Sequence, residues 1–194
     1  MDNFYHPAQR ELQDKFDSRR LADRVADIIV HDSLTDSDRA FIESRDMLFL
    51  STVDPQGRPT VSYKGGEVGF VKVLDDKTIA FAGYDGNGMF LSAGNISANA
   101  AVGLLFIDFN QPQRLRLHGA ASVSTNDDLM NVFIGATYII RITVRDIFIN
   151  CSRYIHRYEK IESSHYIPKA HCEPPIPEWK QLDIIQDVLP KPTR

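Results

Sequence analysis

The chain has 194 residues and a formal net charge of −4, with 43% hydrophobic and 25% charged residues. These proportions are ordinary for a globular protein, and the length is enough for one substantial core. The negative charge gives no general attraction to nucleic acid, and no apolar run approaches the ~20 residues that cross a bilayer. The polar N-terminus lacks the apolar segment of a signal peptide, so we expect a cytoplasmic protein without nucleic-acid or membrane partners.

Helices are predicted in the first 45 residues. Residues 7–30 place apolar side chains at helical spacing, in a stripe that begins at Leu12, and predict a single helix. Thr35 followed by Asp38 has the spacing of a capping box, which predicts a second helix that ends near Arg45.

The hydrophobic period then changes to two. Residues 47–53 form an apolar strand, and residues 59–64 return across the turn at 54–57, which has Pro and Gly where a tight reversal needs them. Residues 70–74 and 78–83 predict a second hairpin.

Three longer strands are predicted further along the chain. Residues 101–109 are nearly all apolar, which predicts a strand that is covered on both faces. Residues 114–124 alternate, and residues 137–150 form a long strand with Tyr138, Ile140, Ile142 and Val144 on one side. The basic side chains of the 114–124 strand share one face: Arg114, Arg116 and His118.

The remaining segments predict short helices and irregular chain. Asn126 is placed to cap a helix through Phe133, and residues 178–188 predict a last helix after a run of prolines. Closely spaced strands with few helices, and no internal repeat, favour one antiparallel barrel with helical appendages.

The turn Asp85-Gly86-Asn87-Gly88 leads into Met89 and a predicted helix. Free backbone N–H groups at a helix start, with glycines that allow close approach, can bind an anion. The alternative is a plain strand-to-helix turn that needs glycine for its backbone angles.

Cations near this turn favour an anion site. Lys64 ends one strand, and Lys72 lies inside an apolar strand, where its amine must reach water or an anion. Arg114 and Arg116 share a face of their own strand, and the arginine fork suits phosphate. The alternative is a solvated strand face; a covered face would favour phosphate or a dimer contact.

Aromatic and titratable residues complete the candidates. Tyr84, Phe90 and Phe106 could offer apolar surface to a planar ring, although each is compatible with an ordinary core position. Asp85, Asp108 and His118 form no recognisable acid–base set, so we assign them no catalytic role. Cys151 and Cys172 are expected to be reduced thiols; together with His165 and His171 they lack metal-ligand spacing, and we predict no metal site.

Several segments in order carry a family likeness. SYKGGEVGFVKVLDDKTIAF, YDGNGMF, GNI, VGLLFIDF, RLRLHGAA and IFINCSRYIH resemble the flavin-nucleotide-binding proteins related to pyridoxamine 5'-phosphate oxidase. The likeness runs from about Thr35 to His156.

This resemblance implies a split antiparallel β-barrel of mainly β class with flanking helices, which binds FMN as a homodimer with the flavin at the subunit interface. The domain would be single, with N-terminal helices at 1–45, the barrel at 46–162 and a Pro-rich extension at 163–194. The strand at 70–74 would contribute backbone and the basic side chain of Lys72 to the flavin.

Further placements follow from the same likeness. Ala82 and Gly83 would lie beside the isoalloxazine ring, residues 87–89 would face the phosphate, and the basic strand at 114–116 would lie near the flavin or the partner subunit. The candidate cofactor-binding residues are Lys64, Phe70, Val71, Lys72, Val73, Ala82, Gly83, Tyr84, Asn87, Gly88, Met89, Arg114 and Arg116.

The chain departs from the family pattern at named positions. Val68-Gly69 stands where relatives often have Pro-Gly, and Lys72 stands where they often have Arg. Ile149-Asn150-Cys151-Ser152 replaces Pro-Asn-Cys-Pro, and the tail from Trp179 does not resemble that of the pyridoxamine phosphate oxidases. We therefore do not assign vitamin B6 oxidation.

The sequence favours an FMN-dependent oxidoreductase of unknown substrate. The alternatives are a flavin-binding module without turnover (a carrier, sensor or store), the same barrel with a deazaflavin or haem, and a purely structural dimer.

Overall fold

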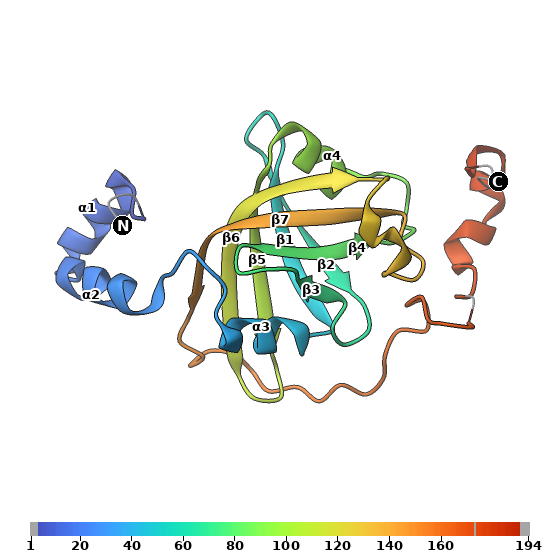
Figure 1. Cartoon of the computed structure of the whole chain (residues 1–194). Coiled ribbons are helices and arrows are strands. Elements are labelled where there is room, and N and C mark those ends of the chain that lie inside the picture. Colours follow the sequence, from blue (N-terminus) through green and yellow to red (C-terminus); the bar gives the residue numbers. More distant parts are fainter. Residues whose placement is uncertain (1–3, 173, 191–194) are drawn as a thin grey trace.

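A computed structural model describes residues 4–172 and 174–190, and shows an antiparallel sheet curled into a half-barrel with flanking helices (Figure 1). The strands are β1 (Met47–Val53), β2 (Pro59–Gly65), β3 (Val71–Val73), β4 (Thr78–Gly83), β5 (Ala101–Asp108), β6 (Gln113–Ser124) and β7 (Tyr138–Ile149). The helices are α1 (Pro7–Lys15), α2 (Arg19–Ile29), α3 (Asp36–Glu43) and α4 (Leu91–Ala98), with 3₁₀ helices η1 (Asp128–Asn131), η2 (Glu178–Gln181) and η3 (Asp183–Val188). The predicted fold class is confirmed.

The strand order is β2-β1-β5-β6-β7-β4-β3, and every neighbouring pair is antiparallel. β2 and β3 therefore lie at opposite edges of the sheet, although residues 66–70 alone connect them. Such a short connection requires the sheet to curl until its two edges approach each other, which gives the half-barrel its opening.

The core fills the inside of the curled sheet. Ile140 and Ile142 of β7 and Leu117 of β6 are fully buried, as the alternation predicted. Ile96 of α4 closes one end of the same cluster. Burying each such side chain stabilises the fold by about 1.5–3 kcal/mol.

β5 differs from the prediction that both its faces are covered. Val102, Leu104 and Phe106 are buried inside, whereas Leu105 and Ile107 on the outer face are only partly buried. The prediction is therefore not met on the outer face, where the described residues cover Leu105 and Ile107 only in part.

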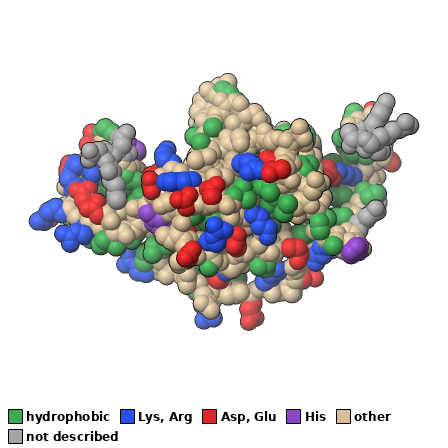
Figure 2. All heavy atoms as spheres, in the orientation of Figure 1, with side chains coloured by type: hydrophobic (Ala, Val, Ile, Leu, Met, Phe, Trp, Pro, Cys, Tyr) green, Lys and Arg blue, Asp and Glu red, His purple; other side chains and the backbone are tan. Residues whose placement is uncertain are grey.

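The N-terminal segment forms two helices instead of the single predicted helix. The chain reverses at Asp17, which takes a left-handed φ of 48°, a conformation that Asp tolerates better than most residues. The backbone N–H of Ser18 donates to Gln13, and Arg19 forms two hydrogen bonds with Asp14 across the turn. The resulting hairpin projects from the barrel and carries charged side chains of both signs beside exposed apolar ones such as Phe16 (Figures 1 and 2).

α3 begins with the predicted capping box. Thr35 Oγ1 accepts from the Asp38 backbone N–H, and Asp38 Oδ2 accepts from the Thr35 backbone N–H at 2.9 Å. His31 Nε2 lies 2.8 Å from the same carboxylate oxygen, and the His31 backbone pairs with Ile147 in β7. These bonds attach α3 to the barrel.

α3 also covers the free edge of β3. Arg39 Nη1 donates to the Val73 carbonyl at 2.6 Å, and the Val73 N–H donates to Glu43 Oε1 at 3.2 Å. The edge backbone groups of Val73 are thus satisfied by side chains rather than by another strand.

Two predicted helices are shorter and tighter than expected. Asp127, not Asn126, caps η1, because its Oδ1 accepts from the Leu129 N–H at 2.9 Å. Near the C-terminus, η2 and η3 replace the single predicted helix; Leu182 between them is 54% exposed, so no apolar face packs there to stabilise an α-helix. None of the helices among the described residues is long and apolar enough to cross a membrane.

Gly119 occupies a register shift between β6 and β7. A Cβ there would lie 2.3 Å from the Thr143 carbonyl oxygen. We expect Gly119→Ala to lower the free energy of unfolding by about 1–3 kcal/mol, since backbone must move to admit the methyl group. Urea unfolding of this variant beside Gly103→Ala, where the nearest atom is 3.8 Å from the new Cβ, checks this. Equal losses in the two variants would contradict it.

Arg141 of β7 holds the segment that contains η1. Its Nε and Nη2 donate to the two oxygens of Asp127 at 2.7 and 2.8 Å, and Nη2 also contacts Asp128. The hydrogen bonds from Arg141 keep the pKa of the Asp127 carboxyl well below its usual range.

We expect Asp127→Asn to lower the free energy of unfolding at neutral pH by about 1–3 kcal/mol, because a charged hydrogen-bonded pair is lost. A carboxyl whose pKa is lower in the native state stabilises the fold above its unfolded pKa of about 3.9. This stabilisation is lost as the pH falls from there toward the native pKa. The difference between wild type and variant should therefore shrink as the pH is lowered from 5 to 3 (about the window set by these pKa values). Asp17→Asn, which removes a long and exposed pair with Arg20, is the control and should show no such trend.

Candidate functional site

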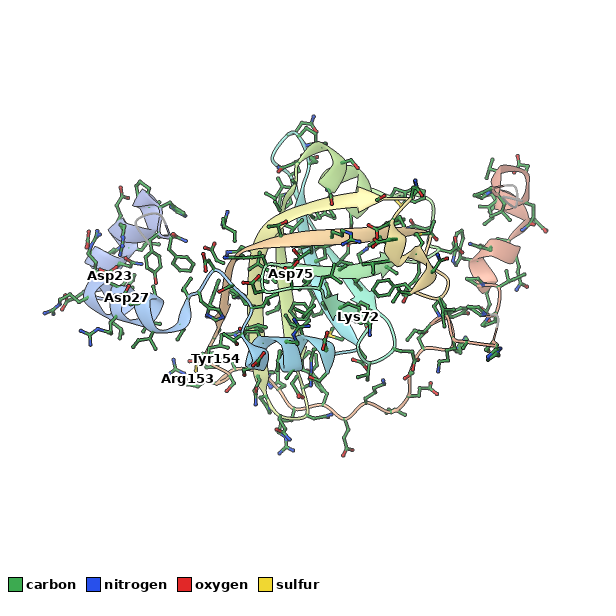
Figure 3. All side chains as sticks on the ribbon, viewed as in Figure 1. Asp23, Asp27, Lys72, Asp75, Arg153 and Tyr154 are labelled. Carbon is green, nitrogen blue, oxygen red and sulfur yellow. The ribbon has the colours of Figure 1, made fainter. Side chains whose placement is uncertain are left out.

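β3 presents one charged side chain to the outside. Val71 and Val73 are buried in the core, and the alternation of the strand turns Lys72 outward. Figure 3 shows Lys72 on the open side of the barrel, well separated from Arg153 and Tyr154. Lys72 has no hydrogen bond or ion pair to any residue that the structure describes.

Lys72 lies beside the turn that precedes β3. Gly69 takes a left-handed φ of 78°, and a Cβ on it would lie 3.7 Å from the Lys72 amine. The Gly69 N–H donates to the Arg45 carbonyl at 3.1 Å, which fixes the turn. Glycine at this position therefore lets the backbone adopt the turn and leaves the amine accessible.

A cleft of about 370 Å³ opens beside Lys72. One wall comes from residues 67–70, and Tyr84 follows β4 on the same side. Residues 132–134 and 168–170 form the other walls. The volume is at the small end of ligand pockets, so a ligand the size of a nucleotide would extend beyond it.

The cleft combines aromatic and apolar surface with charge. Phe70, Tyr84 and Phe133 supply aromatic side chains, and Figure 2 shows apolar side chains with basic ones on this face. Burial, with a smaller contribution from the Glu67 charge, raises the pKa of Tyr84. Tyr84 therefore stays protonated at neutral pH and can donate a hydrogen bond.

Of the residues predicted to contact the cofactor from β3 and its start, only some have side chains or backbone groups that a ligand could reach. Phe70 lines the cleft, although its ring is 5% exposed and packs edge-on to Phe81. Val71 and Val73 turn their side chains into the core, and α3 already occupies the edge backbone groups of Val73. Lys72 is the side chain of this strand that can reach a ligand.

The residues predicted at the end of β4 also differ in whether they reach the cleft. Ala82 lies under Phe133 in a small outer cluster, and Gly83 faces inward, where a Cβ would overlap the Tyr138 ring at 2.1 Å. The Gly83 carbonyl accepts from the Thr137 N–H. Of the three residues predicted here, only Tyr84 lines the cleft.

The glycine-rich turn is fully exposed and lies outside the cleft. Asn87 Oδ1 accepts from the Met89 N–H at 3.1 Å, so the Asn87 side chain shapes its own turn. Gly88 has a left-handed φ of 75°, and α4 begins only after Phe90. The predicted turn is present, but it is separated from the helix start by two residues.

The remaining predicted cations lie apart from the cleft. Lys64 in β2 is half-buried, and burial lowers its pKa. Arg114 and Arg116 lie on β6, which β7 and β4 separate from β3 in the sheet. Arg114 Nε is buried without a hydrogen-bond partner among the described residues, as is Asn150 Oδ1.

The titratable residues without an assigned role have structural partners. Asp85 is paired with Lys180, and Asp108 lies 2.8 Å from Arg45. His118 lies 3.6 Å from Asp146; burial lowers its pKa and the carboxylate opposes this. In the described part of the chain, no group of three or more His, Cys, Asp or Glu residues could hold a metal.

Sequence reasoning missed two walls of the cleft. Residues 132–134 follow a 3₁₀ turn, and residues 168–170 lie in irregular chain. Neither segment carries a hydrophobic period or a turn motif that points to a ligand. Glu67, which also lines the cleft, carried no signal because a charged loop residue is ordinary.

Known structures share this fold. HupZ of Group A Streptococcus is 19% identical, with 64% of this chain and 99% of HupZ covered and a TM-score of 0.50. A putative pyridoxamine 5'-phosphate oxidase from Lactobacillus delbrueckii is 21% identical, with 61% and 95% covered and a TM-score of 0.48. HutZ, the haem storage protein from Vibrio cholerae, is 21% identical, with 58% and 92% covered and a TM-score of 0.41. At such identities, likeness of structure concerns the fold alone.

A sequence profile of the pyridoxamine 5'-phosphate oxidase family matches residues 34–157. No curated protein sequence matches the chain. The profile match covers α3, all seven strands and the cleft walls up to residue 134, which is more than half of the chain. The chain therefore belongs to the pyridoxamine 5'-phosphate oxidase family.

Proposed function

We propose that this protein binds FMN in the cleft beside Lys72 and acts as a flavin-dependent oxidoreductase. The observation that carries the proposal is the outward-facing Lys72 amine, which has no partner among the described residues and lies beside aromatic side chains. An accessible cation next to flat apolar surface suits a ligand with a planar ring and a phosphate.

The residues present fit FMN. Lys72 would hold negative charge of the cofactor, Tyr84 would donate a hydrogen bond, and Phe133 would exclude water from one side of the cleft. When bound, FMN supplies hydride-transfer chemistry, and the protein supplies orientation and electrostatics.

One observation favours a second candidate, a flavin-binding module without turnover. Glu67 is the carboxylate that lines the cleft, and its Oε1 lies 3.2 Å from the Lys169 amine. Among the described residues that line the cleft, no carboxylate is therefore left without a charged partner.

We further propose a homodimer with the flavin at its interface. Val61 and Tyr63 on the outer face of β2 are 66% and 63% exposed, and the Tyr63 ring contacts Phe49 of β1. Exposed apolar side chains on neighbouring strands favour a protein partner, and a two-fold copy is the commonest one. The unpartnered Nε of Arg114 supports this, since leaving a buried donor unpaired costs about 1–3 kcal/mol.

Binding and turnover are tested separately. Added FMN should raise the melting temperature, because a ligand that binds the native state stabilises it. An absorbance spectrum of the purified protein distinguishes flavin from haem or a deazaflavin. Oxidation of NADH or NADPH by the flavin-loaded protein supports the enzyme, and FMN binding without oxidation of either donor supports the module. If FMN neither binds nor shifts the melting temperature, both candidates fail.

Lys72→Ala should weaken FMN binding by about 1 kcal/mol or more, roughly five-fold, because a charged hydrogen bond is lost. Lys72→Arg should keep most of the affinity. Lys77→Ala is the matched control, because Lys77 lies in the turn after β3 and pairs with Asp32 outside the cleft. Fluorescence titration measures all three, and unchanged affinity in Lys72→Ala would remove Lys72 from the site.

The dimer should have twice the 22.0 kDa mass of the chain in light scattering at micromolar concentration. Val61→Asp should shift the mass toward the monomer, because a charge would be buried without a partner. Leu12→Asp changes another exposed apolar residue, on α1, and should leave the dimer intact. A monomeric wild type, or a dimer broken only by Leu12→Asp, would contradict this interface.

A further inference from the structure

The chain beyond the region that matches the family forms a C-terminal strap, residues 158–172 and 174–190. In the described residues the strap adds no strand to the sheet and no α-helix. It follows the lower side of the barrel in Figure 1 and ends on the side opposite to α1 and α2. Near its start, the Tyr158 N–H donates to the Phe109 carbonyl, which attaches the strap to the barrel.

The strap contributes little to the hydrophobic core. Ile161 is 98% exposed and Ile184 is 84% exposed. A segment whose apolar side chains remain in solvent gains little free energy from burial, so hydrophobic packing does not fix the position of the strap on the barrel. Its close contacts with the barrel lie elsewhere.

Those contacts include the cleft beside Lys72. Residues 168–170 form one of its walls. Pro168 packs against Gly135, whose φ is 73° and where a Cβ would lie only 2.6 Å from the Pro168 Cβ. The absence of a side chain at Gly135 thus allows the strap to join the wall at residues 132–134.

Two ion pairs hold the strap on either side of the cleft. Lys169 pairs with Glu67, which precedes β3, and Lys180 pairs with Asp85, which follows β4. In each pair at least one partner is well exposed, and such ion pairs contribute little, so the strap can detach locally while the barrel stays folded.

We propose that the strap is part of the FMN site, in which it forms the outer wall and slows release of the cofactor. The inference rests on the proposed FMN binding, and it assigns a role to a segment that the family match does not cover. Lys180 acts as a positioning residue, because it holds the wall without lining the cleft.

The first test removes an ion pair that does not touch the cleft. Lys180→Ala should accelerate FMN release by about two- to five-fold, the range expected for one exposed ion pair, with the association rate unchanged. Lys180→Arg should restore the wild-type release rate. Arg19→Ala, which breaks a surface pair between α1 and α2, is the control and should release FMN at the wild-type rate.

The second test moves the wall by a steric change. Gly135→Ala and Gly57→Ala introduce the same backbone strain, since both glycines have positive φ, but an added Cβ at Gly57 meets no atom within 4 Å. Faster FMN release in Gly135→Ala alone supports the strap contact. Equal release rates in the two variants overturn it.

Trp179, the single tryptophan of the chain, lies in the strap next to Lys180. Its fluorescence therefore reports how exposed the strap is, with or without FMN. Acrylamide quenching of Trp179 should increase in Lys180→Ala and decrease when FMN saturates the wild type. A loosened strap with unchanged FMN release, or unchanged quenching in Lys180→Ala, overturns the strap proposal. If the wild type binds no FMN at all, the proposed function fails instead, so the two failures are distinguishable.

Discussion

The inward and outward alternation of side chains along β3 and β4 is the constraint on which the candidate site depends. Val71 and Phe81 fill the inside of the half-barrel, and the same period places Lys72 and Tyr84 outside. A slip of one residue would expose the apolar side chains and bury the amine, so core packing fixes the register. The position of the cation is therefore a consequence of how the barrel folds.

The walls of the cleft differ in how firmly they are held. The wall formed by β3 and Tyr84 belongs to the core sheet. The segment at 132–134 follows Asp127, which accepts two hydrogen bonds from Arg141 of the sheet. The strap depends on exposed ion pairs and on Pro168. One side of the cleft is thus rigid while the opposite side can adjust, which is a suitable arrangement for a cofactor that must enter.

The strands and the start of α3 could be predicted because their signals are local. Thr35 and Asp38 bond to each other, and the alternation of the residues around Ile140 reports one buried face. The break at Asp17 could not be predicted, since it depends on a backbone angle and on contacts across the new turn. The site was found in part: Lys72 and Tyr84 meet in the cleft, whereas the segment around Pro168 comes from far along the chain without a pattern.

The covering of β3 by α3 has a consequence for how copies of the chain can associate. An open edge strand presents unpaired N–H and C=O groups to which any extended segment can add. Here Arg39 and Glu43 occupy the Val73 groups, and the strand is only three residues long. At Val73 the edge beside the cleft therefore has no free backbone groups with which an incoming strand could pair.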